Sequence, residues 1–269
     1  MAHDSIPSAE LAFLLSVQDL YWSLISSAEH DASSHAEPGL GGQLLYAGRL
    51  DDQGRVLVVA ANIAGAATLT ATDDPNAQRQ AIRDGVIDFA VTTLDEALRI
   101  LKNEVRKRET VAVCVGARPD AVEAEMHERG VVPDMIADGQ GQQVAGLARS
   151  ARSIEPLPVA DSQAMVTWSV AAGATQWLSR VDAFAVACLD SDAWAERRWL
   201  RLAPRFLGRM TRGTHALRCE PDAADGFIKR VELADLRCEL GLPVEIEISR
   251  RGVSERHRFS PAGPPKGIR

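Results

Sequence analysis

Two glycines and two aspartates stand where the chain leaves its first predicted strand. Gly48 and Gly54 border a loop after the strand expected at 43–47, and Asp51 and Asp52 lie between them. Dinucleotide-binding folds need glycines here, because the backbone must approach a pyrophosphate and the next helix must point its first N–H groups at it. Two carboxylates would repel that group, and their Cβ atoms would obstruct its approach. The loop therefore has the glycines of a phosphate-binding loop, but its two carboxylates disfavour a bound phosphate.

Further polar residues follow the other predicted strands. In open α/β sheets, ligands bind beyond the carboxyl ends of the strands. We expect that edge to gather Gly48, Asp51, Asp52, Thr72, Gly116, Arg118, Asp138 and Gln140. Arg118 is the only fixed cation among them, so it is the ligand candidate. It would pair with the aspartates in the empty state or receive an anionic ligand; the alternative is a surface arginine in a loop before a proline.

An alternation of strands and helices must position these residues. After an amphipathic helix at 9–29, the sequence predicts strands at 43–47, 67–72, 111–115 and 134–137 and helices at 55–65, 77–84, 94–107 and 120–129. Such alternation indicates a parallel sheet with right-handed crossovers. Residues 55–61 alone would also suit the returning strand of a hairpin. We favour the helix, because Ala60, Ala61 and Gly65 suit close packing on a sheet.

The composition changes after residue 150, where four of the five tryptophans and three of the four cysteines lie. Strands are predicted at 165–170, 183–189, 215–219 and 244–249, with helices at 193–207 and 222–239. The fold class is therefore α/β: a Rossmann-like domain with its N-terminal helix at 1–150, and a smaller α/β or α+β unit of unknown role at 151–269. The proline-bearing stretch 154–158 is the candidate boundary.

Net charge and composition limit the classes of binding partner that we expect. With 37 acidic against 30 basic residues the net charge is −7, which disfavours nucleic acid. No apolar run is long enough to span a membrane, and no signal peptide precedes Leu11. Scattered cysteines without a C-x-x-C pair indicate reduced thiols and a cytoplasmic protein. A small molecule, a protein partner or a second copy in a homo-oligomer is expected instead.

Two motifs carry a family resemblance. Residues 94–98 read Leu-Asp-Glu-Ala-Leu, and residues 129–134 read Arg-Gly-Val-Val-Pro-Asp. With the glycine loop, they make residues 14–143 similar to the Rossmann-like cofactor domain of the urocanase (urocanate hydratase) family. The resemblance implies an NAD site, in which Gly48 and Gly54 belong to the phosphate loop. Gln18, followed by Tyr21, would then lie on the cofactor side; the alternative is a polar position on an amphipathic helix.

The chain departs from the family at the cofactor contacts. Asp51-Asp52 replaces a central Gly-Gly, and Thr72 stands where a glutamate takes the ribose hydroxyls. Asp73 could substitute for that glutamate; the alternative is that Asp73 and Asp74 serve to cap a helix that begins at the following proline. Arg118-Pro119 replaces Asn-Ala. A Gln-Thr-Ser-Ala-His run becomes residues 139–143, including Gln140, after a retained Asp138.

Candidate catalytic groups are lacking. No cysteine has the family's glycine- and aromatic-rich setting, and Cys188, at the end of an apolar strand, suits a buried small hydrophobe. His30 and His35 lack closed metal-ligand spacing, and a strand would keep His215 and Cys219 from sharing a metal. No metal site and no catalytic residue is therefore assigned.

The sequence predicts a urocanase-like protein that lacks urocanate hydratase activity and NAD. It would bind a small ligand or a partner through the former cofactor crevice. The alternative is a divergent urocanate hydratase-type lyase or NAD-dependent enzyme, with its missing residues supplied by the C-terminal half or by a partner subunit. A scaffold acting through homo-oligomer contacts is the third class.

Overall fold

A computed structural model describes residues 8–26, 39–137, 152–154, 162–170, 175–211, 213–241 and 243–260. The chain divides into two compact units. One comprises residues 16–157, and the other comprises residues 1–15 together with 158–269. The limits expected from sequence, 1–150 and 151–269, thus differ from the units at the boundary and in the grouping of the first residues. No described helix combines the length and apolar character that crossing a membrane requires.

A parallel sheet organises the unit of residues 16–157. Its six strands are β1 (Leu44–Arg49), β2 (Ala67–Ala71), β3 (Phe89–Val91), β4 (Ala112–Val115), β5 (Met135–Ala137) and β6 (Arg152–Ile154), in the order β3-β4-β2-β1-β5-β6. Every pairing between neighbours is parallel. Short β3 and β6 were not predicted. The arrangement confirms the Rossmann-like α/β prediction.

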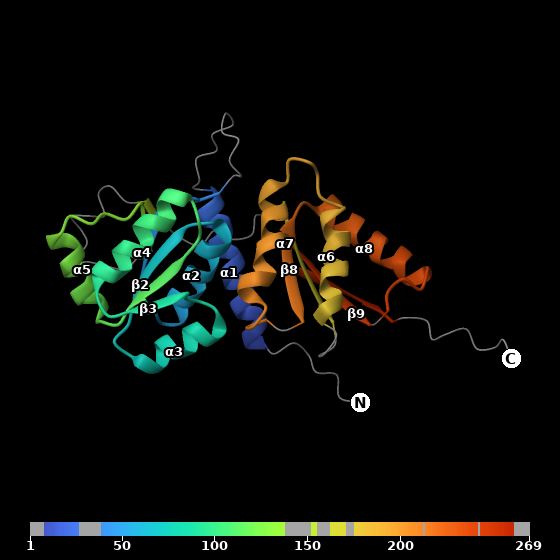
Figure 1. Cartoon of the computed structure of the whole chain (residues 1–269). Helices are drawn as coiled ribbons and strands as arrows, with labels where there is room; N and C mark the ends of the chain where they lie inside the picture. Colours follow the sequence, from blue (N-terminus) through green and yellow to red (C-terminus); the bar gives the residue numbers. More distant parts are fainter. Residues whose placement is uncertain are drawn as a thin grey trace. The chain divides into compact units, whose positions relative to one another are not determined.

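Helices cover both faces of this sheet (Figure 1). They are α2 (Asp52–Ala64), α3 (Pro75–Asp84), α4 (Leu94–Lys107) and α5 (Pro119–Glu128), and α1 (Ser8–Ser26) precedes the sheet in sequence. The first crossover is helical, as we predicted: β1 pairs with β2 in parallel, and no hairpin forms with residues 55–61. Central strands β2 and β4 are buried along their whole length, as expected of strands covered on both faces.

Local capping explains why the helices begin where they do. Thr93 accepts a hydrogen bond from the Glu96 backbone N–H at 3.3 Å, and the Glu96 carboxylate accepts one from the Thr93 N–H at 3.3 Å. This capping box fixes the start of α4. After α5, Gly130 adopts a left-handed φ of +64° and leads the chain toward β5. The two motifs thus have structural roles, as the sequence suggested.

An antiparallel sheet forms the second unit. Strands β7 (Ala164–Val170), β8 (Thr214–Cys219), β9 (Val244–Arg250) and β10 (Val253–Phe259) lie in the order β10-β9-β7-β8. The helices are α6 (Leu178–Val186), α7 (Trp194–Leu207) and α8 (Pro221–Leu236), with the 3-10 turn η2 at Thr175–Trp177. This is an α+β unit.

One predicted strand of the second unit is wrong. Residues 183–189 were expected to form a buried strand, but Leu178–Val186 is helix α6, and a turn follows it. Leu178, Val181 and Ala185 are the buried residues of α6 and lie at helical spacing. Cys188 therefore lies in the turn after a helix and not at the end of a strand.

Candidate functional site

The β1–α2 turn is built around two glycines. Gly48 has a φ of +68° and lies where the pairing register of β1 with β2 shifts. Gly54 lies in the first turn of α2 against the end of β1. A Cβ there would lie 1.9 Å from the Arg49 carbonyl oxygen, so only glycine lets the helix begin this close to the strand. The backbone conformation at Gly48 and the close approach of α2 to β1 at Gly54 therefore account for both glycines of this loop.

Asp51 occupies the place where a dinucleotide fold holds its phosphates. It is the N-cap residue of α2, and its Oδ1 accepts a hydrogen bond from the Gly54 backbone N–H at 3.0 Å. Asp52 follows as the first residue of the helix. A helix N-terminus attracts anions through its free N–H groups and its dipole. Here one of those N–H groups is already bound to the chain's own carboxylate, and a second acidic side chain stands beside it.

The end of β2 is engaged in capping the next helix. The Thr72 hydroxyl accepts a hydrogen bond from the Asp74 N–H at 3.2 Å, and Thr72 is only 5% exposed. Asp74 caps α3, accepting from the Asn76 N–H at 2.8 Å, which is the helix-cap role expected for it. A buried hydroxyl cannot offer a ribose the bidentate acceptor that a carboxylate supplies. Thr72 therefore lacks the two acceptor oxygens that the family resemblance leads us to expect at this position.

Gln78 of α3 fills the space over the ends of β2 and β4. Its Nε2 lies 3.3 Å from the Thr72 carbonyl oxygen and 3.8 Å from Cys114 Sγ. A Cβ placed on Gly116 would come within 3.1 Å of the same nitrogen. The β2–β4 part of the crevice edge is thus occupied by a side chain of the protein. Sequence reasoning overlooked Gln78, although its place in the turn of helix after Asp74 could have marked it.

Arg118 lies at the crevice edge but pairs with a residue that we had not placed there. Its Nη2 and Nε lie 2.7 and 3.0 Å from the two carboxylate oxygens of Asp120. The side chains of Arg118 and Asp120 are 69% and 49% exposed. Of the alternatives that the sequence left open, the pairing with the loop aspartates is therefore not formed, and Arg118 is an exposed arginine in a local fork-to-fork pair at the start of α5.

Gln18, Asp138 and Gln140 are the other predicted site residues, and the structure describes only Gln18 of these three. Gln18 in α1 is fully buried, and neither its Oε1 nor its Nε2 has a hydrogen-bond partner among the described residues. Buried amides without partners are rare in folded proteins. Asp138 and Gln140 lie outside the residues that the structure describes, as do His30 and His35.

Glu123 is a buried acid beside β1 that the sequence analysis did not identify. Glu123 of α5 is 6% exposed, and its Oε1 accepts a hydrogen bond of 3.1 Å from the hydroxyl of fully buried Tyr46. Burial raises the pKa of the Glu123 carboxyl above its ordinary value of 4.5, and the charge of Asp120 adds to the effect. The signal was available: Val122, Glu123 and Met126 share the apolar side of the predicted helix.

This raised pKa predicts a pH-dependent effect of Glu123→Gln. The unfolded carboxyl ionises near 4.5 while the folded one keeps its proton, so the native protein loses stability as pH rises through the folded pKa. Glutamine keeps the acceptor for Tyr46 and does not titrate. We therefore expect the variant to gain stability over the wild type between pH 4 and pH 7 in urea unfolding. An equal difference at both pH values would contradict the assignment; exposed Glu128→Gln is the control.

The second unit holds a partly buried histidine–aspartate pair. Asp182 Oδ1 in α6 accepts from Trp168 Nε1 at 3.0 Å and lies 2.8 Å from His215 Nδ1. The side chains of His215 and Asp182 are 16% and 13% exposed. An aspartate at Nδ1 favours the proton there and leaves Nε2 as the acceptor. No cysteine or serine nucleophile contacts His215 in the hydrogen bonds of the described residues, so the pair fixes α6 to β8.

The four cysteines lie among the residues that the structure describes. All four cysteines are free thiols, and burial raises the pKa of Cys114 to about 11 and that of Cys219 to about 12. Such thiols are poor nucleophiles at neutral pH. The described residues contain no group of three metal-binding side chains.

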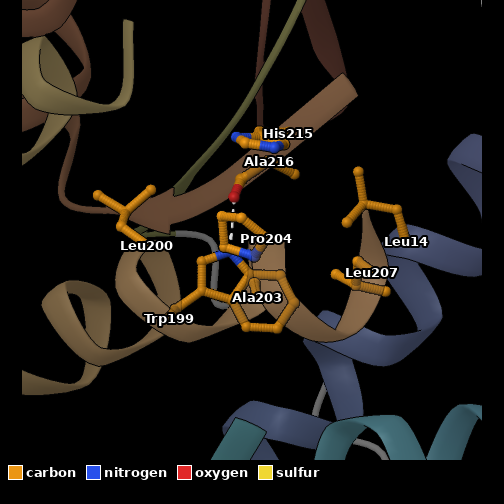
Figure 2. Close-up of a pocket in the computed structure, with 8 residues that line it drawn as sticks. All are labelled: Leu14, Trp199, Leu200, Ala203, Pro204, Leu207, His215 and Ala216. Atoms are coloured by element: carbon orange, nitrogen blue, oxygen red, sulfur yellow. Dashed lines mark hydrogen bonds between the residues drawn. The ribbon is translucent and has the colours of Figure 1, made fainter. Parts of the chain in front are cut away.

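A small cavity lies between α7 and β8 (Figure 2). Its volume of about 10 Å³ would hold about one water molecule, so it is too small for a metabolite. The lining is mainly apolar and consists of Leu14, Trp199, Leu200, Ala203, Pro204, Leu207, His215 and Ala216. Trp199 Nε1 donates to the Ala216 carbonyl oxygen at 2.6 Å across its edge. We regard it as a packing defect of the core.

The parallel sheet, its crossover helices and the glycine turn after β1 define the class: the chain contains a Rossmann-like domain. Residues 25–143 match the family model described as the urocanase Rossmann-like domain. The chain is also 30% identical over 123 residues to S-methyl thiourocanate hydratase from Variovorax sp. (strain JCM 16519 / RA8). This match covers 45% of the chain and 22% of the relative. The N-terminal half thus carries a urocanase-type domain, and the chain spans a minor part of the curated relative it matches.

Proposed function

We propose that this urocanase-type domain binds a small anionic ligand at its crevice edge, does not bind NAD in the family's pose, and has no urocanate hydratase activity. The observation that carries the proposal is the capping of α2 by Asp51. A pyrophosphate in the family's position would have to displace the Asp51 carboxylate from the Gly54 N–H. It would then lie beside both Asp51 and Asp52. Like charges at this distance disfavour the bound state, and the helix dipole is already compensated.

The adenosine end of the crevice supports the same conclusion. Thr72 is buried and bound to the Asp74 backbone, and Gln78 lies over the ends of β2 and β4. A ribose would meet an amide side chain where the family offers a carboxylate. The residues present do not fit NAD, which leaves exposed Arg118 as the ligand candidate at this edge.

Arg118 can exchange its partner Asp120 for a ligand with little loss of stability. Exposed ion pairs contribute little stability, because water screens both charges. The Asp120 partner is itself half exposed, so a ligand carboxylate or phosphate can replace it without burying a charge. A guanidinium presents a planar fork that matches such a group in two places. This favours a small anion over a neutral ligand.

The proposal is tested by a melting-temperature screen of anionic metabolites on wild type and Arg118→Ala. A ligand that binds the native state raises the melting temperature in proportion to ln(1 + [L]/Kd). We expect at least one hit that Arg118→Ala abolishes, with the unliganded melting temperature unchanged. Arg99→Ala, an exposed arginine of α4, is the control and should keep the hit. A hit that survives Arg118→Ala would move the site away from this edge.

A divergent urocanate hydratase-type lyase or NAD-dependent enzyme is the second candidate. Two observations favour it: the matched relative is named as a hydratase, and Gln18 holds a buried amide without partners. Turnover of urocanate or of an S-methylated thio analogue by the purified chain would select this candidate. A protein partner at the same edge, or a scaffold role, would give neither turnover nor a metabolite hit.

A further inference from the structure

The described sheets have edges that are protected to different degrees. In the parallel sheet, edge strands β3 and β6 are three residues long. In the antiparallel sheet, the β8 edge lies beside α7, and Trp199 Nε1 binds the Ala216 carbonyl oxygen. Strand β10 differs, because it pairs with β9 over seven consecutive positions without a register shift and is exposed over most of its length. A long, regular edge without proline or bulge is a template for another strand.

The side chains of β10 alternate between the two faces of the sheet. Val253, Glu255, His257 and Phe259 share one face, and Val253 is 67% exposed. The other face carries Arg256 and Arg258, which pair with Glu247 and Glu245 of β9 at 2.7 and 2.5 Å. The charges of that second face are thus compensated within one copy of the chain.

We propose that β10 is a homodimer interface, at which two copies pair antiparallel about a two-fold axis through Arg256. The two four-stranded sheets would join into one continuous eight-stranded sheet. In this register Glu255 of each copy lies opposite His257 of the other, and Val253 lies opposite Phe259. Direct cross-strand pairs of this kind stabilise a sheet, whereas like charges destabilise it. This inference does not depend on the proposed ligand site.

The sequence of β10 favours this register over its neighbours. A slip of one residue would place side chains on opposite faces and is excluded by the pleat. A shift of two places Glu255 opposite Glu255 in one direction, and His257 opposite His257 in the other. In the proposed register, the one like-charged contact is Arg256 with its symmetry mate. Each Arg256 is held by Glu247 through both Nε and Nη2, at 3.2 and 2.7 Å.

Charge reversal tests both the interface and the register. Sedimentation equilibrium of the full 29.0 kDa chain should show a concentration-dependent dimer. Glu255→Lys and His257→Glu should each raise the dimer dissociation constant at least about tenfold, because symmetry applies each change twice. The double variant again sets a lysine opposite a glutamate, with the two signs exchanged, and should restore dimerisation. Glu232→Lys on the exposed face of α8 is the matched control and should dimerise as the wild type does.

Three results would overturn the proposal. A wild type that is monomeric over about 1 to about 500 µM has no such interface. If neither single variant changes the dimer dissociation constant, the dimer forms through another surface. If both single variants are monomeric and the double variant is monomeric as well, β10 contributes to dimerisation but the two strands do not pair in the proposed register. Far-UV circular dichroism of each variant shows that it is folded, and recovery in the double variant cannot come from unfolding.

Discussion

Gly54→Ala should destabilise the urocanase-type domain by about 3 kcal/mol or more, although alanine is the better helix former. Helix propensity alone would favour alanine by about 1 kcal/mol. The added Cβ would lie 1.9 Å from the Arg49 carbonyl oxygen, so α2 would have to move away from β1. Because overpacking against backbone outweighs propensity, we expect the melting temperature to fall by roughly 10 °C.

Gly130→Ala is the control for this substitution. Gly130 has a φ of +64°, and a Cβ there would meet no atom within 4 Å. Its cost is the left-handed conformation alone, about 1 to 2 kcal/mol. Calorimetry of the two variants should rank Gly54→Ala as the more damaging. The reverse order would mean that α2 does not begin against the end of β1.

Asp182→Ala should destabilise the unit of residues 1–15 and 158–269 by about 2 to 4 kcal/mol. One carboxylate oxygen accepts from Trp168 Nε1 and contacts His215 Nδ1. Trp168 is 1% exposed, so its N–H would be left buried without a partner. Urea unfolding followed by tryptophan fluorescence measures this, because four of the five tryptophans lie in this unit.

Asp182→Asn separates the hydrogen bonds from simple truncation. The amide oxygen can still accept from Trp168, so we expect a loss of about 1 kcal/mol. If asparagine is as damaging as alanine, the charge of Asp182 and not its acceptor geometry holds the cluster. If neither variant changes the unfolding midpoint, the cluster does not stabilise this unit.

The parallel sheet and its helices could be predicted because their sequence patterns are clear. Buried apolar strands alternate with capped helices, and Thr93 and Asp74 mark helix starts with known chemistry. Residues 55–61 were ambiguous, since a β-branched run suits a strand or a buried helix equally. What decided the helix was the small residues that pack on the sheet. Strand β3, three residues long, has no period to detect.

The second half was harder because its elements contradict simple patterns. Residues 183–189 are apolar enough for a buried strand, yet helix α6 begins earlier, at Leu178, and buries one side at helical spacing. Strand β10 carries Glu255, Arg256, His257 and Arg258 in succession, so no apolar run marks it. Only its pairing with β9 makes it a strand, and pairing is a long-range property.

The contacts of the candidate site residues could not be predicted from the sequence. We expected Asp51 to repel a pyrophosphate, but its hydrogen bond to the Gly54 N–H, which satisfies the helix end, depends on the turn geometry. For Arg118 the sequence left open a pairing with the loop aspartates, an anionic ligand or a surface position before a proline, whereas the structure shows an exposed ion pair with Asp120, two residues away. The Tyr46–Glu123 pair joins residues far apart in sequence, which no local pattern reveals.

The most direct test of this account is a titration of the purified chain with NAD, followed by melting temperature. We expect no shift at millimolar NAD, because Asp51 caps α2 and Gln78 covers the ends of β2 and β4. A family-like site would stabilise the protein by about 2.7 kcal/mol at a hundredfold excess over Kd. A melting temperature that rises steadily with NAD concentration would contradict the proposed absence of NAD binding and would make the divergent lyase or NAD-dependent enzyme the better candidate.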